Sequence, residues 1–258
     1  MDLTFEEHGE GKPIFLLHAF PLSRAMWQPQ IATLKSERLR IIAPDLRGFG
    51  ETHNFSDINT MEDMARDVAE LFGALNIERA IVIGLSMGGY VTFELLKNFP
   101  EKIAGLVLCD THAGADSDET HESRFNLIEK IEKEGAQALI DDLLPKLICE
   151  NTKQNKKELV EKIAEMFRSA NPKAVIAALR GMAKRADNNA LLDQISVPTL
   201  LIFGAEDKIT NLEMAEKMRN KIPDSQLSVI ENAGHFSNLE QPEVCNSRLI
   251  DFINTVEI

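Results

Sequence analysis

The sequence predicts one α/β domain built around a mostly parallel sheet of about seven strands, with helices on both faces. Apolar runs rich in Val, Ile and Leu recur along the chain, as expected for parallel strands covered on both sides. Segments with helical periodicity separate most of these runs. A chain of 258 residues can enclose a single large core. The predicted strands are residues 4–7, 13–17, 39–43, 80–83, 105–109, 198–203 and 226–230.

Boundary signals mark the helices between these strands. Thr60 to Asp63 resembles a capping box and opens a helix with an apolar face. Asn171-Pro172 and Gln241-Pro242 each place a proline at the start of a helical pattern. These signals predict helices after residues 60, 171 and 241.

The strand pattern stops between residues 112 and 171. This segment is rich in Glu and Lys and carries three amphipathic stripes, so it predicts an all-helical insertion. We therefore expect a core of residues 1–111 and 172–258, with a helical lid of residues 112–171. The stripes need a partner surface, so the lid is expected above the C-terminal ends of the strands, and its removal is expected to spare the core.

Composition excludes several classes of partner. The net charge of −13 argues against a nucleic-acid partner. Three scattered cysteines, Cys109, Cys149 and Cys245, do not form a disulfide framework. No apolar run reaches membrane-spanning length, and residues 1–4 show no signal-peptide pattern. We therefore expect a cytoplasmic protein with no membrane partner.

The most informative local feature is Gly84-Leu85-Ser86-Met87-Gly88. It follows the apolar run at 80–83 and precedes a helical stretch, which is the context of a serine nucleophile on a tight strand-to-helix turn. Side chains at 84 and 88 would collide in such a turn, and glycine removes them. The alternative is a glycine-rich turn with a solvated serine.

A serine nucleophile needs a base, and the base needs an orienting acid. Of the six histidines, His235 lies just beyond the last predicted strand. In triads built on this kind of turn, the chain order is nucleophile, acid, histidine, and Asp207 stands between Ser86 and His235. Asp110, at the end of another predicted strand, is the rival acid.

Catalysis by acyl transfer also needs donors for a developing oxyanion. The backbone N–H of Met87, directly after the serine, is one candidate. The second is expected in the loop after residues 13–17, and we assign it to the Phe20 N–H. His18 in that loop is expected to be structural, with its ring holding the loop in place.

Several stretches together resemble the α/β-hydrolase superfamily, especially small carboxylesterases and 3-oxoadipate enol-lactonase-like hydrolases. The matching stretches are residues 16–22, 44–50, 84–89, 107–111, 197–204 and 233–235. The resemblance implies Ser86 as nucleophile, Asp207 as acid and His235 as base, with no metal and no organic cofactor. It also implies that the lid follows the sixth strand of the family's usual order. Two departures are Ala19, where the family usually has glycine, and a short N-terminus that leaves seven strands rather than eight.

The resemblance implies a serine hydrolase that cleaves carboxylic esters or lactones of small molecules through an acyl-enzyme. Acyl transfer, perhydrolysis and a lyase reaction with the same triad stay open as alternative reactions. A ligand receptor without turnover stays open as a non-enzymatic alternative. The oligomeric state also stays open, with a homodimer as the candidate. We expect an apolar substrate pocket lined by Phe125, Leu144 and Phe236. A carboxylated substrate would need a cation there, and Arg24 or Arg124 is the candidate.

Overall fold

The computed structural model describes residues 3–258, so the first two residues of the predicted core lie outside it. Seven strands form one sheet in the order β1-β3-β2-β4-β5-β6-β7. Only β1 is antiparallel to its neighbour, and the other pairs are parallel. The predicted strand number and sheet type are therefore confirmed. The strands are β1 (Phe5–His8), β2 (Lys12–Leu17), β3 (Leu39–Pro44), β4 (Ala80–Leu85), β5 (Ile103–Cys109), β6 (Thr199–Gly204) and β7 (Ser225–Ile230).

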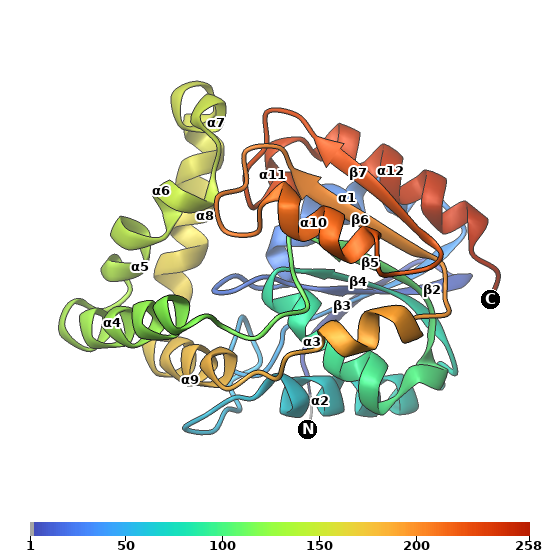
Figure 1. Cartoon of the computed structure of the whole chain (residues 1–258), viewed down its shortest axis with the longest axis horizontal. Coiled ribbons are helices and arrows are strands. Elements are labelled where there is room, and N and C mark those ends of the chain that lie inside the picture. The colour runs from blue at the N-terminus through green and yellow to red at the C-terminus, as the bar shows by residue number, and fades with distance from the viewer. Residues whose placement is uncertain (1–2) are drawn as a thin grey trace.

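Helices cover both faces of this sheet (Figure 1). On one face α1 (Gln28–Leu34) packs against α12 (Pro242–Thr255), and on the other α2 (Met61–Ala74) packs against α3 (Met87–Asn98). Every residue of β4 and β5 is buried, because these central strands have helices above and below. The continuous apolar runs of the sequence follow directly from this two-sided burial.

The predicted helix starts are present. The Thr60 side chain caps α2 by accepting a hydrogen bond from the Asp63 N–H at 3.1 Å. The Asn171 side chain caps α9 (Pro172–Ala183) through the Lys173 N–H at 3.0 Å. Helix α12 begins at Pro242, as the sequence predicts.

Six helices lie between β5 and β6, grouped together on one side of the sheet (Figure 1). Helix α9 packs along α4, so it groups with the lid helices although the predicted lid ends just before it, at residue 171. The division into core and lid stays a proposal. Besides α9, the inserted helices are α4 (Asp118–Glu134), α5 (Gln137–Asp142), α6 (Leu144–Leu147), α7 (Glu150–Asn155) and α8 (Lys157–Ser169). The remaining elements are α10 (Leu212–Arg219), α11 (Ser237–Glu240) and the 3₁₀ turns η1 (Arg24–Trp27), η2 (Pro100–Lys102) and η3 (Asn189–Gln194).

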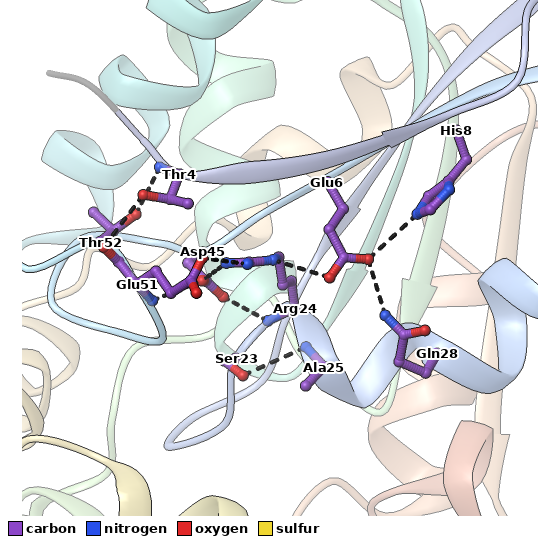
Figure 2. Close-up of polar contacts among 10 residues, drawn as sticks. All are labelled: Thr4, Glu6, His8, Ser23, Arg24, Ala25, Gln28, Asp45, Glu51 and Thr52. Carbon is purple, nitrogen blue, oxygen red and sulfur yellow. Dashed lines mark hydrogen bonds and ion pairs between the residues drawn. The ribbon is translucent and has the colours of Figure 1, made fainter.

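A polar network joins β1 to the loops beside it (Figure 2). The Arg24 guanidinium contacts three carboxylates: Glu6 at 3.3 Å, Glu51 at 2.6 Å and the buried Asp45. Asp45 also accepts the backbone N–H groups of Arg24 at 2.8 Å and Glu51 at 2.9 Å. The network therefore fixes the loop after β3. This loop lies within residues 44–50, one of the matching stretches named in the sequence analysis.

Candidate active site

Ser86 sits on a sharp turn between β4 and α3. Its φ of +53° and ψ of −111° place a non-glycine residue in a rarely occupied region of backbone space. A Cβ on Gly84 would lie 2.5 Å from the Gly88 carbonyl oxygen, and a Cβ on Gly88 would lie 2.1 Å from the Leu17 carbonyl oxygen. Glycine at both positions is thus a steric requirement of the turn.

The backbone of Ser86 is held from β5. Its N–H donates to the Cys109 carbonyl at 3.0 Å, and its own carbonyl accepts from the Thr111 hydroxyl at 2.9 Å. Thr111 lies so close to α3 that a Cβ on Gly89 would be 2.4 Å from its hydroxyl oxygen. The neighbouring strand end therefore supports the unusual backbone of Ser86 on both sides.

Three loops at the C-terminal ends of strands bring Ser86, His235 and Asp207 together. His235 Nε2 lies 2.8 Å from Ser86 Oγ, and His235 Nδ1 lies 2.8 Å from Asp207 Oδ2. The Asp207 carboxylate also accepts the N–H groups of Ile209 at 2.7 Å and Thr210 at 3.1 Å and the Thr210 hydroxyl at 2.5 Å. Sequence reasoning missed Thr210, whose only signal is its place three residues after the acid.

The electrostatics of this chain suit a histidine base. Burial alone would lower the pKa of His235, but the charge and hydrogen bond of Asp207 outweigh it and raise that pKa above its ordinary value. Burial would raise the pKa of Asp207, but the charge and hydrogen bond of His235, with help from Thr210, lower it. The pair therefore favours an ionised acid beside an imidazole that readily takes up a proton.

Asp110, the rival acid, has other partners. Its fully buried carboxyl accepts the Gly204 N–H at 2.8 Å and the Ser237 hydroxyl at 2.5 Å. Burial and the nearby Asp207 raise the pKa of Asp110 well above its usual range. Asp110 thus joins β5, β6 and α11 behind the site, and the carboxylate bonded to His235 is that of Asp207.

The loop after β2 carries the predicted second oxyanion donor. The buried His18 ring accepts the Leu46 N–H at Nε2, at 2.9 Å, and its Nδ1 lies 3.0 Å from the Ala19 carbonyl. Burial lowers the pKa of His18, so the neutral ring fastens this loop, as predicted. Ala19 is not among the residues with positive φ in the described chain, so an alanine fits there without backbone strain.

Two backbone amides in this region are available as hydrogen-bond donors to an anion. Met87 is the first residue of α3, where N–H groups have no partner within the helix. Phe20 follows Ala19 in the loop fixed by His18. Within residues 3–258, neither amide N–H has a hydrogen-bond partner. The assignment of both groups to an oxyanion hole stays a prediction.

The three predicted pocket residues differ in their surroundings. Phe236 is fully buried, with its ring 5.8 Å from that of His235, and Leu144 is buried at the start of α6. Phe125 is 43% exposed, and its ring lies 4.9 Å from that of His121 on the same helix. The structure thus brings Phe236 beside the histidine, whereas the roles of Leu144 and Phe125 stay predictions.

Neither arginine proposed for a carboxylated substrate is free. Arg24 is bound by the three carboxylates of Figure 2. Arg124 binds Asp116 at 2.6 Å and 3.0 Å, and Asp116 also pairs with Arg185. Arg124 lines a cavity of about 510 Å³ beside the loop that follows Asp207, but its guanidinium already has a carboxylate partner there. The expectation that one of these arginines neutralises a substrate is not supported.

The part of the chain that the structure describes offers neither a metal-binding cluster nor a membrane-spanning helix. Residues 3–258 contain no group of three or more His, Cys, Asp or Glu side chains arranged to hold a metal ion. None of the helices in this range has the length and apolar character needed to cross a bilayer.

Comparison with known proteins gives a consistent set of relatives. Residues 12–242 match the sequence profile of a family described as the alpha/beta hydrolase fold. The chain is 29% identical to 3-oxoadipate enol-lactonase 1 of Acinetobacter baylyi, over 90% of this chain and 85% of the relative. It is 43% identical to the malate-bound thermophilic esterase of Thermogutta terrifontis, with a TM-score of 0.95 and coverage of 98% and 93%. The enol-lactonase of Burkholderia xenovorans is 26% identical, with a TM-score of 0.91 and coverage of 98% and 96%.

Proposed function

The chain belongs to the alpha/beta hydrolase fold family, and on this basis we propose that it hydrolyses carboxylic esters or lactones of small molecules with Ser86 as nucleophile. The observation that carries the proposal is the unbroken chain of contacts from Asp207 through His235 to Ser86, at 2.8 Å and 2.8 Å. The esterase and lactonase relatives support the same reaction class. No metal or organic cofactor is needed for this chemistry.

In the proposed reaction, Ser86 Oγ attacks the carbonyl carbon while His235 Nε2 takes the hydroxyl proton. The oxygen of the tetrahedral intermediate accepts hydrogen bonds from the N–H groups of Met87 and Phe20. His235 then donates its proton to the departing alkoxide, which leaves an acyl-enzyme. Water, deprotonated by His235, attacks this ester, and His235 returns the proton to Ser86 Oγ as the acid leaves. Asp207 keeps the imidazole in the required tautomer throughout.

The pH dependence of kcat/KM tests the base. Only neutral His235 can accept the serine proton, so activity should fall as pH drops through the pKa of this residue. Because the pKa of His235 is raised, the acid limb should have its midpoint above the ordinary value of 6.5. The measurement is kcat/KM against pH with a substrate that does not titrate. A midpoint clearly below 6.5 would contradict the assignment.

Substrate charge gives a second test. Arg24 and Arg124 are both occupied by carboxylates of the protein, and the net charge of −13 repels anions. We therefore expect uncharged esters to be turned over with a kcat/KM at least about tenfold above that of a lactone bearing a carboxylate, equivalent to roughly 1.4 kcal/mol. The measurement is a panel of p-nitrophenyl esters of rising chain length beside such a lactone. Equal rates for both classes would show that a cation reaches the substrate.

Acyl transfer, perhydrolysis and lyase chemistry use the same residues, so the proposal of hydrolysis needs its own test. Water should remain the main acyl acceptor when a competing alcohol or peroxide is present at millimolar concentration. The ratio of free acid to transferred product measures this directly. Location in the cytoplasm and a homodimeric state stay predictions.

A further inference from the structure

A buried carboxylate outside the candidate triad, that of Glu240, lies next to the histidine loop. Glu240 ends α11, and its side chain is fully buried. Its Oε1 accepts the Gly234 N–H at 2.7 Å, and its Oε2 accepts the Cys149 N–H at 2.8 Å. Lys156 Nζ contacts the backbone carbonyl of Glu240, and within residues 3–258 no Lys or Arg side chain forms an ion pair with its carboxylate. Two backbone amides thus take the place of a cation at this carboxylate.

The two amides belong to segments far apart in the chain. Gly234 precedes His235, whereas Cys149 lies between α6 and α7 in the lid. Further contacts join the same segments: the His235 N–H donates to the Leu147 carbonyl at 2.8 Å, and Cys149 Sγ lies 3.2 Å from the Asn232 carbonyl. The lid segment 147–149 therefore lies directly against the histidine loop 232–235.

The contact between these backbones is too close for any added side chain. A Cβ on Gly234 would lie 2.9 Å from the Cys149 nitrogen and 3.0 Å from the Leu147 oxygen. A Cβ on Gly204 would likewise lie 2.0 Å from the Gly234 oxygen, so β6 limits the loop from its other side. The histidine loop is held between the sheet and the lid, and the Glu240 carboxylate bridges the loop to the lid.

We propose that Glu240 is a positioning residue for His235, because its carboxylate ties the histidine loop to the lid segment 147–149. The proposal rests on the proposed function of His235 as the catalytic base. A consequence is that this part of the lid moves together with the histidine. A disturbance of the lid at Cys149 should then change the chemical step without any contact between Cys149 and the substrate.

Glu240→Gln tests the bridge from the carboxylate side. The amide keeps one oxygen but turns an NH₂ group toward the second N–H, so one of the two bonds is lost. With the loop loosened, we expect kcat to fall about 10- to 100-fold with a smaller change in KM, as for a slightly misplaced base. The exposed Glu243→Gln, three residues along, is the matched control and should behave like the wild type.

The pH profile separates the effect of the Glu240 charge from the effect of positioning. Asp207 and Glu240 face His235 with negative charge, the carboxyl of Asp110, whose pKa burial raises, lies behind it, and His112 lies near it after β5. Removal of the Glu240 charge disfavours the protonated imidazole, so the acid limb of kcat/KM should move to lower pH in Glu240→Gln. A shift of this limb with an unchanged kcat would report the lost charge alone, so positioning is shown by the fall in kcat on the pH plateau, measured well below the melting temperature of the variant.

Cys149→Pro tests the bridge from the lid side. Cys149 has a φ of −71° and Ile148 has φ −117° and ψ 147°, both suitable for a proline at 149. Proline removes the N–H that Glu240 accepts, and Cys149→Ser, which keeps that N–H and an N-cap side chain, is the control. We expect kcat to fall about tenfold or more in Cys149→Pro, and to stay near the wild-type value in Cys149→Ser.

Amide hydrogen exchange provides a readout that does not depend on activity. In both Glu240→Gln and Cys149→Pro, peptides covering 232–235 should exchange faster than in the matched controls. If folded variants keep wild-type kcat, acid limb and exchange, the proposal is overturned. If the wild type itself turns over no ester, the proposed function fails, and faster exchange still supports the bridge. Should Glu240→Gln fail to fold, the Cys149 pair decides alone.

Discussion

Ser86→Ala should reduce ester turnover by a factor of at least about 10⁴, because removal of a triad nucleophile leaves only the contributions of the oxyanion donors and of substrate binding. The loss follows from the 2.8 Å contact between Ser86 Oγ and His235 Nε2, because an alanine leaves the base without a hydroxyl to activate at Nε2. Initial rates with a p-nitrophenyl ester measure the effect.

The fold should survive this substitution. The positive φ of Ser86 is supported through its backbone by Cys109 and Thr111, and an alanine keeps both hydrogen bonds. Alanine faces the same backbone strain as serine, so the melting temperature should change little. Turnover within tenfold of the wild type, in a folded variant, would remove Ser86 from the mechanism.

Asp207→Asn should lower kcat by a factor on the order of 10⁴, as known for an acid-to-amide change in such a triad. The His235 ring needs an acceptor at Nδ1 so that Nε2 is free to take the serine proton. An asparagine can turn an NH₂ group toward Nδ1 and so stabilise the wrong tautomer. It also removes the charge that raises the pKa of His235.

Asp110→Asn is the matched control for this prediction. Asp110 accepts from Gly204 and contacts Ser237, and an asparagine can accept from the first and donate to the second. Since burial favours the neutral form of Asp110, a neutral amide is a close mimic. We expect a loss of less than about tenfold, in line with one altered hydrogen bond. The opposite ranking of the two folded variants would assign the acid role to Asp110.

Much of the fold could be predicted from local patterns in the sequence. The seven strands could be predicted because buried parallel strands require continuous apolar runs, and helix starts carry their own capping residues at Thr60 and Asn171. The glycines at 84 and 88 were predictable for a related reason. A Cβ at 84 would meet Gly88 within the same strand–turn–helix unit, which sequence spacing expresses, whereas a Cβ at 88 would meet the Leu17 carbonyl of β2.

The ion-pair partners of charged side chains could not be predicted from local patterns. Arg24 and Arg124 looked available for a substrate, but each meets carboxylates brought to it by other elements. The prediction that the lid can be removed without effect on the core stays untested, but contacts across the lid argue against it. The lid supplies the Leu147 carbonyl to the His235 N–H and the Cys149 N–H to Glu240, so its loss would take these partners from the histidine loop and from the Glu240 carboxylate.

By itself, then, the sequence determined the α/β architecture, the serine turn and the residue types of the candidate triad, because these depend on periodicity and on spacing within short segments. The resemblance already favoured Asp207 over Asp110, but only the tertiary structure shows the contact of His235 with Asp207 and the bridge of Glu240 between the histidine loop and the lid. Both aspartates follow strands at the same edge of the sheet. Their roles differ through the paths of loops between residues far apart in the chain, and no local pattern encodes those paths.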